Sequence, residues 1–190
     1  KPGPVARDSY GRIIAGIEVG GVDLSTHLLS LGLAHLFLIP PDDQDHTARR
    51  AAQTKARTAS RGIWSTDRYR GVLHITSFHA NADGDDRINL NGEYLRIANI
   101  SDRQVDIDGF RIAEQSGRSW LLPPMLIPPG HTFKLHSGSG TNQSDPLKQL
   151  AVYLNNDTPI WNNTRDRATL YDRHGKMIDS RLHAPKNPSR

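Results

Sequence analysis

LNGEYLRIAN, residues 90–99, carries an Asn-Gly turn signal followed by a run with apolar side chains at alternate places, Leu95 and Ile97. An apolar residue at every second place predicts a strand with one buried face and one solvated face. The Asn-Gly pair agrees with this, because it favours the tight turns that separate strands. The stretch therefore predicts one strand of a sheet.

Turn signals of the same kind recur about every ten residues from Val72 onward. They are Asp83-Gly84, Asn91-Gly92, Asp108-Gly109, Pro128-Pro129-Gly130, Gly138-Ser139-Gly140, Asn155-Asn156 and His174-Gly175. Short apolar-rich runs lie between them, at 73–75, 94–97, 105–107, 133–135, 152–154 and 169–171. Many short strands separated by turns are typical of an all-β sandwich, which we expect over residues 72–183.

The chain before residue 65 has a different pattern. We expect a strand over 12–19 that ends at Gly20-Gly21, since glycine adopts positive φ without steric strain. A helix should follow, capped by Asp23 or Ser25, with leucines on one face and Gly32 at its end. The apolar residues 33–39 predict a buried strand, which Pro40-Pro41 stops because proline has no N–H to donate.

A second helix is expected from His46 to Ser60, capped by Asp45 and ended by Gly62. One face consists of small residues, Ala48, Ala51, Ala52, Ala56 and Ala59. The other is basic and expected to be solvated, with Arg49, Arg50, Lys55, Arg57 and Arg61. Such a face can follow a phosphate backbone, although exposed lysine and arginine more often serve solubility. Residues 65–71 are expected to form a linker and 184–190 a tail.

Composition sets limits on the class of protein. With 190 residues and 36% hydrophobic residues, the chain can bury the core of one large or two small domains. No apolar run approaches the ~18 residues of a membrane span, so we expect no transmembrane segment. The absence of cysteine excludes disulfides and thiolate metal sites. An excess of 24 Lys and Arg over 20 Asp and Glu is too small to identify a nucleic-acid partner by itself.

Three linked elements in the first 64 residues resemble the second half of a staphylococcal-nuclease-like (thermonuclease) domain. They are Asp8-Ser9-Tyr10-Gly11-Arg12, the segment 25–34 ending in Gly-Leu-Ala, and the segment 52–64 ending in Gly-Ile-Trp. The resemblance implies part of an oligonucleotide-binding-fold barrel that hydrolyses DNA and RNA with one calcium ion. It places Arg12 as the catalytic arginine at the scissile phosphate and Tyr10 as a substrate-binding residue beside it. A guanidinium suits this role because its charge is permanent and its fork of donors matches phosphate oxygens.

The departures from that family are as informative as the matches. The family's calcium-binding aspartates, general-base glutamate and second arginine come from its first half, which these residues do not contain. We therefore expect calcium for a complete domain, no metal ligands in this chain, and no nuclease activity from the 190 residues alone. The two tyrosines that line the family's nucleotide pocket fall at Leu38 and Pro40, and a helix-opening asparagine is Ser25. Base stacking is accordingly in doubt.

The second part of the chain resembles the lamin-tail domain, which implies an immunoglobulin-like β-sandwich over residues 72–183. The resemblance rests on residues 90–99, 105–110, the proline turn 126–130, Trp161-Asn162-Asn163 and the stretch 166–175. One departure is Arg165, where the family usually has glycine. Such domains accompany secreted nucleases and other surface hydrolases, so we expect an extracellular or cell-envelope location. They are not themselves catalytic, and the partner of this one is left open.

Other candidate sites have simpler explanations. The run Asn81-x-Asp83-Gly84-Asp85-Asp86 offers oxygen ligands for a hard cation, but it lacks the distal glutamate of a calcium loop. None of the nine histidines forms a close metal-binding pair.

Two functions remain. One is the C-terminal part of a secreted calcium-dependent nuclease with a lamin-tail appendage, acting on DNA or RNA. The other is a non-catalytic binding or surface-attachment module with a degenerate nuclease remnant.

Overall fold

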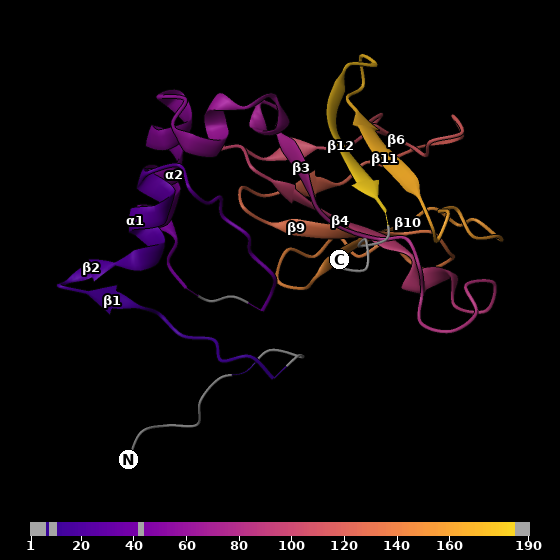
Figure 1. Ribbon diagram of the computed structural model, residues 1–190, viewed down its shortest axis with the longest axis horizontal. Helices are drawn as coiled ribbons and strands as arrows, with labels where there is room; N and C mark the ends of the chain where they lie inside the picture. Colours follow the sequence, from indigo (N-terminus) through magenta and orange to yellow (C-terminus); the bar gives the residue numbers. More distant parts are fainter. Residues whose placement is uncertain (1–6, 8–10, 42–43, 185–190) are drawn as a thin grey trace, which may run out of the picture.

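The computed structural model describes residues 7, 11–41 and 44–184. Two helices precede a β-rich region, so the fold is a partial α+β nuclease half followed by an immunoglobulin-like sandwich (Figure 1). No helix in these described ranges has the length and apolar content needed to cross a membrane.

The first part begins with a hairpin of β1 (Glu18–Val19) and β2 (Val22–Asp23), followed by α1 (Leu24–Ser30) and α2 (Thr47–Thr58). The predicted Gly20-Gly21 turn is confirmed, with both glycines at positive φ. Asp23 caps α1, since its carboxylate accepts the backbone N–H groups of Ser25 and Thr26 at 3.3 and 3.1 Å. Together with the hydrogen bond from the Thr26 hydroxyl, the largest cause, these contacts lower the pKa of Asp23 to about 2.

Two strand predictions in this part were wrong. The strand expected over 12–19 is reduced to Glu18–Val19, because within the described residues only β2 provides a ladder beside it. Residues 33–39 form no strand. Instead Leu36 and Leu38 are buried while Leu33, Phe37 and Ile39 are exposed, and Leu38 alone forms a bridge, to His131. The alternation of buried and exposed side chains in that run therefore arises because the run docks on the sandwich, and not because it is a strand within a sheet.

The sandwich consists of two four-stranded sheets and a small ladder. The first sheet has the order β10-β9-β4-β3, formed by β3 (Leu73–His79), β4 (Tyr94–Asn99), β9 (Thr132–His136) and β10 (Leu150–Tyr153). The second has the order β12-β11-β6-β7, formed by β6 (Arg111–Ala113), β7 (Ser119–Leu121), β11 (Asp166–Tyr171) and β12 (Met177–His183). Strands β5 (Val105–Asp106) and β8 (Leu126–Ile127) pair with each other.

Residues at alternate places in these strands face inward and build one core. It includes Leu73, Ile75, Leu95, Ile97, Ile112, Phe133, Leu135, Leu150, Val152, Ala168 and Leu170. All neighbouring strands are antiparallel except β9 and β10, which run parallel. The sandwich predicted from the turn spacing is thus confirmed, and residues 94–99 form a central strand of the first sheet.

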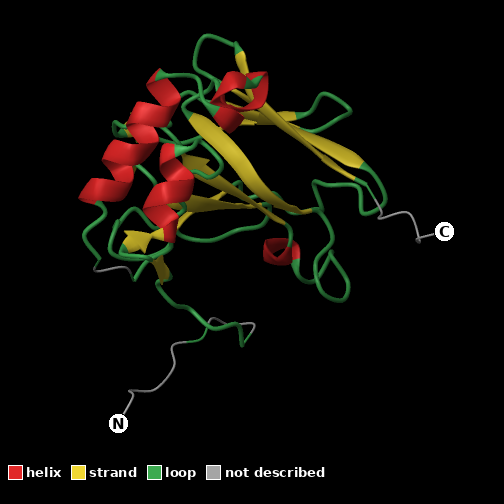
Figure 2. Cartoon of the chain, turned by 60° about the vertical axis from the view of Figure 1, so that its left-hand side comes forward, coloured by secondary structure: helices red, strands yellow, loops and turns green. Residues whose placement is uncertain are grey.

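The helices pack directly against the sandwich, as Figure 2 shows. A second cluster of buried side chains joins the two parts, with Ala56 and Trp64 from the helical side and Ala98 and Ile100 from the sheet side. Arg57 donates to the carbonyls of Ile100 and Gly71, both at 3.0 Å. These contacts make the interface between the two parts a packed core with its own hydrogen bonds.

The segment expected to be a linker takes part in this interface. It follows a short 3-10 helix, η1 (Gly62–Ser65), and contains a second one, η2 (Asp67–Tyr69). The ring of Tyr69 lies 4.4 Å from that of His74 and 6.0 Å from that of Trp64, measured between centroids. A third 3-10 helix, η3 (Leu90–Gly92), precedes β4. The connection between the two parts is therefore ordered by side-chain packing.

Candidate functional site

Arg12 lies on an exposed segment that leads into the β1–β2 hairpin. Gly11 before it has φ of 76°, and the carbonyl of Gly11 accepts a hydrogen bond from the Arg7 guanidinium at 2.5 Å. An isolated bridge between Arg7 and Ile13 closes the loop. Figures 1 and 2 show this segment running from β1 away from both helices. Tyr10, the second predicted site residue, lies outside the described residues.

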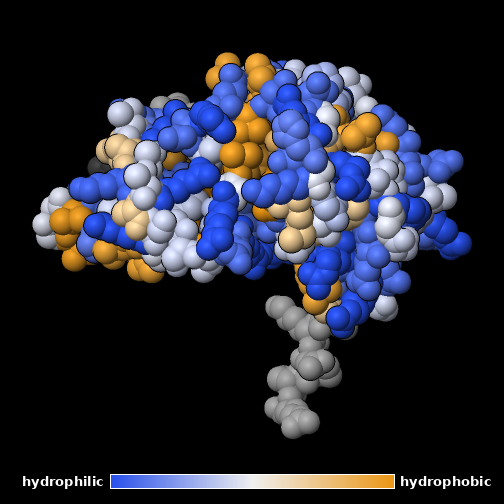
Figure 3. Space-filling view, turned by 90° about the horizontal axis from the view of Figure 1, so that it is seen from above, coloured by the Kyte–Doolittle hydropathy of each residue, from blue (hydrophilic) through white to orange (hydrophobic). Residues whose placement is uncertain are grey.

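Apolar side chains around Arg12 are exposed to an unusual degree. The exposed fractions are 60% for Ile13, 58% for Ile14, 55% for Ile17, 68% for Val19 and 50% for Val22. Figure 3 shows hydrophobic atoms on the surface at the left-hand end of the molecule, where Figure 1 places the hairpin. Scattered apolar residues are normal on a surface, but a contiguous run of this kind indicates a face that another element covers.

The two glycines of the Gly-Leu-Ala and Gly-Ile-Trp motifs contact each other. Gly32 ends α1 with φ of 70°, and its carbonyl accepts the N–H of Ile63 at 2.8 Å. A Cβ at Gly32 would lie 2.3 Å from the Arg61 carbonyl oxygen, and a Cβ at Gly62 would lie 2.2 Å from that of Gly32. These motif glycines are therefore needed for a close backbone crossing.

Leu38, which occupies a nucleotide-pocket position of the nuclease family, has a structural role here. Its N–H donates to the Gly130 carbonyl at 2.8 Å, and its carbonyl accepts the N–H of Thr132 at 3.2 Å. The Leu38 side chain is only 6% exposed. A buried aliphatic residue hydrogen-bonded to the sandwich cannot stack on a base, so this position binds the sandwich instead.

The basic face predicted for α2 is divided, which corrects that prediction. Arg57 is half-buried and donates to main-chain carbonyls, while Arg49 forms an ion pair with Asp23 at 3.3 Å. Arg50 and Lys55 remain exposed. The buried side of the helix is marked by Gln53 and Ala56, whereas Ala48, Ala51 and Ala59 are exposed. The buried face of α2 therefore includes two long polar side chains, Gln53 and Arg57, which both donate to the Ile100 carbonyl.

The acidic run at 81–86 also has structural partners. Asp86 accepts the N–H of Ala82 at 2.8 Å and an N–H of the Asn163 side chain, while Asp85 pairs with Arg87 at 3.0 Å. Within residues 7, 11–41 and 44–184, no three His, Asp or Glu side chains are close enough to hold a metal ion together.

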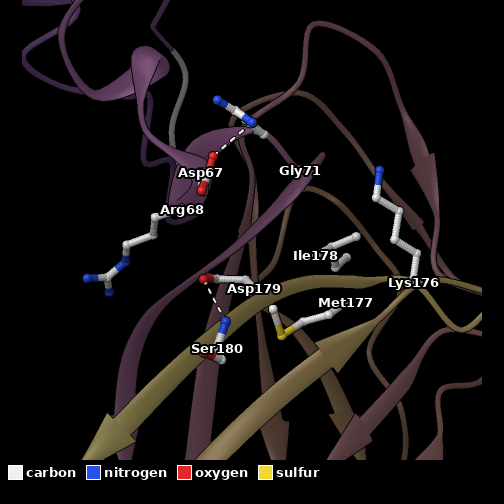
Figure 4. A pocket seen from close by; sticks show the side chains of 9 residues that line it. Asp67, Arg68, Gly71, Lys176, Met177, Ile178, Asp179 and Ser180 are labelled. Carbon is white, nitrogen blue, oxygen red and sulfur yellow. Dashed lines mark hydrogen bonds and ion pairs between the residues drawn. The ribbon is translucent and has the colours of Figure 1, made fainter.

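A hollow lies where η2 meets β12, and Figure 4 shows its lining. Its walls come from the segment 67–71 and from residues 176–180. Asp67 pairs with Arg70 at 2.8 Å. The Asp179 carboxylate accepts a hydrogen bond from the N–H of Ile75 at 2.6 Å, and it lies 2.9 Å from His74 Nδ1. Because its acidic groups are already engaged within the fold, we assign no reaction to this hollow.

His35 forms part of an aromatic group at the interface of the two parts. Its ring centroid lies 5.6 Å from that of His74 and 6.0 Å from that of Tyr69. Burial lowers the pKa of His35, and the nearby His74 lowers it further, against a hydrogen bond with the Leu36 carbonyl. The neutral imidazole is therefore favoured in the folded protein.

This depressed pKa predicts a loss of stability in mild acid. Below about pH 6.5 the unfolded chain protonates at His35 while the folded chain resists, so stability falls as the pH decreases from there. We expect His35→Gln to remove part of this slope, at most about 1.4 kcal/mol per pH unit. Urea denaturation at pH 7.5, 6.5 and 5.5 measures the difference. Identical slopes in wild type and variant would contradict the assignment.

Sequence reasoning missed a set of aromatic residues on the sandwich. His79, Tyr94, His136 and Tyr153 are register partners across β3, β4, β9 and β10. Each stands near the end of a strand in a different part of the chain, and their alignment depends on strand order and register. The sequence pattern carries no signal for either, since it indicates only which face each residue takes.

Two family models match the chain. The model described as Staphylococcal nuclease homologue matches residues 3–66, and the model described as Lamin Tail Domain matches residues 66–183, more than half of the chain. No curated protein matches the chain significantly.

Proposed function

Since this chain belongs to the lamin tail domain family and carries a staphylococcal-nuclease-like segment before that domain, we propose that it is the C-terminal part of a secreted calcium-dependent nuclease. Its substrates would be the phosphodiester bonds of DNA and RNA. The observation that carries the proposal is the match over residues 3–66 together with the exposed Arg12. An extracellular or cell-envelope location belongs to the same proposal.

Arg12 would act by stabilising charge. As water attacks the phosphorus atom, negative charge grows on the non-bridging oxygens. A guanidinium can donate two parallel hydrogen bonds to them. Arginine remains protonated, so it cannot remove the proton from the attacking water. That step requires a base, and in the complete domain calcium would add positive charge at the phosphate. The resemblance to the nuclease family assigns the base and the metal ligands to the first half of the complete domain, and the proposal follows it.

The exposed apolar run supports an additional covering element at this site. Ile13, Ile14, Ile17, Val19 and Val22 expose half or more of their surfaces on the segment that carries Arg12. Burying one such side chain stabilises a protein by about 1.5–3 kcal/mol, so leaving five uncovered is unfavourable. Further strands of a barrel would cover them and would also form a wall beside the phosphate.

The test uses the chain extended upstream by a segment that carries the family's carboxylates. We expect Arg12→Ala in that protein to lower turnover on single-stranded DNA by ~10²-fold or more, the scale for loss of one preorganised donor. Arg12→Lys should recover only part of the activity, because a point charge cannot make the two-pronged contact. The assay is calcium-dependent release of acid-soluble nucleotides.

Arg50→Ala provides the matched control, since Arg50 is an exposed arginine on α2. It should leave turnover within about twofold of wild type, as surface substitutions rarely perturb a fold. The unextended 190 residues should be inactive. Activity in the unextended chain, or unchanged turnover in the extended Arg12→Ala protein, would remove Arg12 from the catalytic role.

A second candidate function is a binding or attachment module that has lost catalysis. Leu38 favours it, because a residue at a nucleotide-pocket position is buried against Gly130 of the sandwich. Under this alternative the extended protein would fold and bind its partner without hydrolysing DNA or RNA. The same assay separates the two functions.

A further inference from the structure

The outward face of the sheet β10-β9-β4-β3 carries one aromatic ring from every strand. We call these four residues the aromatic rung: His79, Tyr94, His136 and Tyr153. His79 stacks on Tyr94 with 4.2 Å between centroids and 17° between planes. His136 stacks on Tyr153 at 4.9 Å and 14°, and lies 5.7 Å from Tyr94. The rung is therefore a continuous row of rings across the full width of the sheet.

The rung is open to solvent although it packs internally. His79 is exposed, and Tyr94, His136 and Tyr153 are half-buried. A Cβ at Gly140 would lie 2.5 Å from the Tyr153 ring, so the backbone of Gly140 covers that end of the row. The Nδ1–H of His136 donates to the Asn91 carbonyl at 2.9 Å, which leaves Nε2 as the acceptor nitrogen. The row thus presents ring edges and one exposed ring at the His79 end.

Two cations occupy the next row of the same face. Arg96 on β4 and Lys134 on β9 are direct register partners, and both are half-buried. The Lys134 ammonium lies 4.4 Å from the centre of the Tyr94 ring, and the Arg96 guanidinium lies 5.9 Å from that of Phe37. Arg96 also donates to the Thr132 hydroxyl at 3.2 Å and to the Gln149 side-chain oxygen. Arg96 also lowers the pKa of Lys134, after the larger effect of burial.

Among the described residues, the nuclease half covers one end of this face. Ala98 is buried under Ala56 and Trp64, and Thr132 bonds to Leu38. The arginine–lysine row lies at the margin of that cover, where Phe37 contacts Arg96. The aromatic rung lies one row further out. A ligand on the open rows would therefore begin beside the nuclease half and extend over the sandwich.

We propose that this face binds single-stranded nucleic acid, with phosphates at Arg96 and Lys134 and bases against the aromatic rung. Rings beside cations on an exposed sheet are suited to single strands, because every base has a π-face and every nucleotide a phosphate. Burial also lowers the pKa values of His79 and His136, with Lys134 and Arg96 adding to the effect, which favours neutral rings that can stack. The inference goes beyond the proposed hydrolysis and does not depend on Arg12.

The test measures binding of a labelled oligothymidylate of about 20 nucleotides to the 190-residue chain by fluorescence anisotropy, in EDTA and low salt. We expect Lys134→Glu to weaken binding roughly tenfold or more, since it replaces a phosphate contact with a repulsive charge. Lys176→Glu is the matched control, because Lys176 is an exposed lysine in the turn before β12 of the other sheet and the change in net charge is the same. It should change affinity by less than about threefold.

A second comparison isolates the contribution of the bases to the affinity. An abasic strand of the same length keeps the phosphates, so Lys134→Glu should lower the affinity for it as well. His79→Ala should lower only the affinity for the base-bearing strand, by about fivefold or more. His79 is exposed at the end of β3, so its removal leaves the core intact. Heparin provides a polyanion without bases. Equal affinity for heparin, abasic strand and oligothymidylate, or no effect of either substitution, would overturn the proposal. In an extended Arg12→Ala protein that hydrolyses nothing, binding of oligothymidylate that is weakened by Lys134→Glu would support it.

Discussion

Replacement of Trp64 by alanine is expected to lower the free energy of unfolding by about 3–5 kcal/mol, the range for removing a buried tryptophan. Trp64 is 4% exposed and packs with Ala56, Ala98 and Ile100. The Arg57 guanidinium lies 5.6 Å from the ring centre. The indole therefore fills the junction between the helices and the sandwich, and its removal would leave a cavity between Ala56, Ala98 and Ile100.

Urea denaturation followed by far-UV circular dichroism measures this effect. Leu121→Ala is the control, since Leu121 is 71% exposed and its truncation should cost less than about 0.5 kcal/mol. Because Trp64 contacts both parts of the chain, its loss should shift the unfolding of the sandwich as well as that of the helices. A shift confined to the helical signal, or a total loss below about 1 kcal/mol, would show that the junction contributes little to stability.

Gly32→Ala and Gly62→Ala are each expected to destabilise the protein by about 2–4 kcal/mol. Both glycines have positive φ, which costs an L-residue about 1–2 kcal/mol. In addition, each new Cβ would lie within 2.3 Å of a backbone oxygen, and relieving such overlap costs about 1–3 kcal/mol. The affected atoms belong to the backbone crossing that joins the end of α1 to η1, so they cannot rotate away.

Gly175→Ala separates the two contributions. Gly175 has φ of 79°, but a Cβ there would meet nothing within 4 Å. This control should therefore lose only the stability that corresponds to the cost of positive φ. Thermal unfolding of the three variants gives the comparison. Losses at Gly32 and Gly62 no larger than that at Gly175 would mean that the close approach is not rigid.

Predictions from the sequence succeeded where a local pattern decides structure. The Asp23 cap needs only a short carboxylate before free N–H groups, and the Gly20-Gly21 turn needs only positive φ. Strands such as Tyr94–Asn99 show their two faces as alternation. Strand β12 (Met177–His183) was missed, because polar residues interrupt its alternation and Asp179 turns inward to bind Ile75 and His74.

Predictions failed where the environment of an element comes from distant parts of the chain. Residues 33–39 are apolar enough for a strand, yet they dock on Gly130 and Thr132 through Leu38. Arg57 looks like a solvated helix residue, but it reaches the carbonyls of Ile100 and Gly71. Propensity and periodicity describe a segment's preferences, and they do not identify the surface that it meets.

The sequence by itself determined the two parts of the chain, most of the longer strands of the sandwich and the candidate arginine, because turn chemistry, alternation and motif spacing are local properties. The tertiary structure alone decided which residues face each other. It joined Gly32 to Gly62, buried Trp64 between the two parts, and aligned the aromatic rung beside Arg96 and Lys134. The reason is physical: strand order and register are chosen by the free energy of burying the whole core, to which residues from every part of the chain contribute.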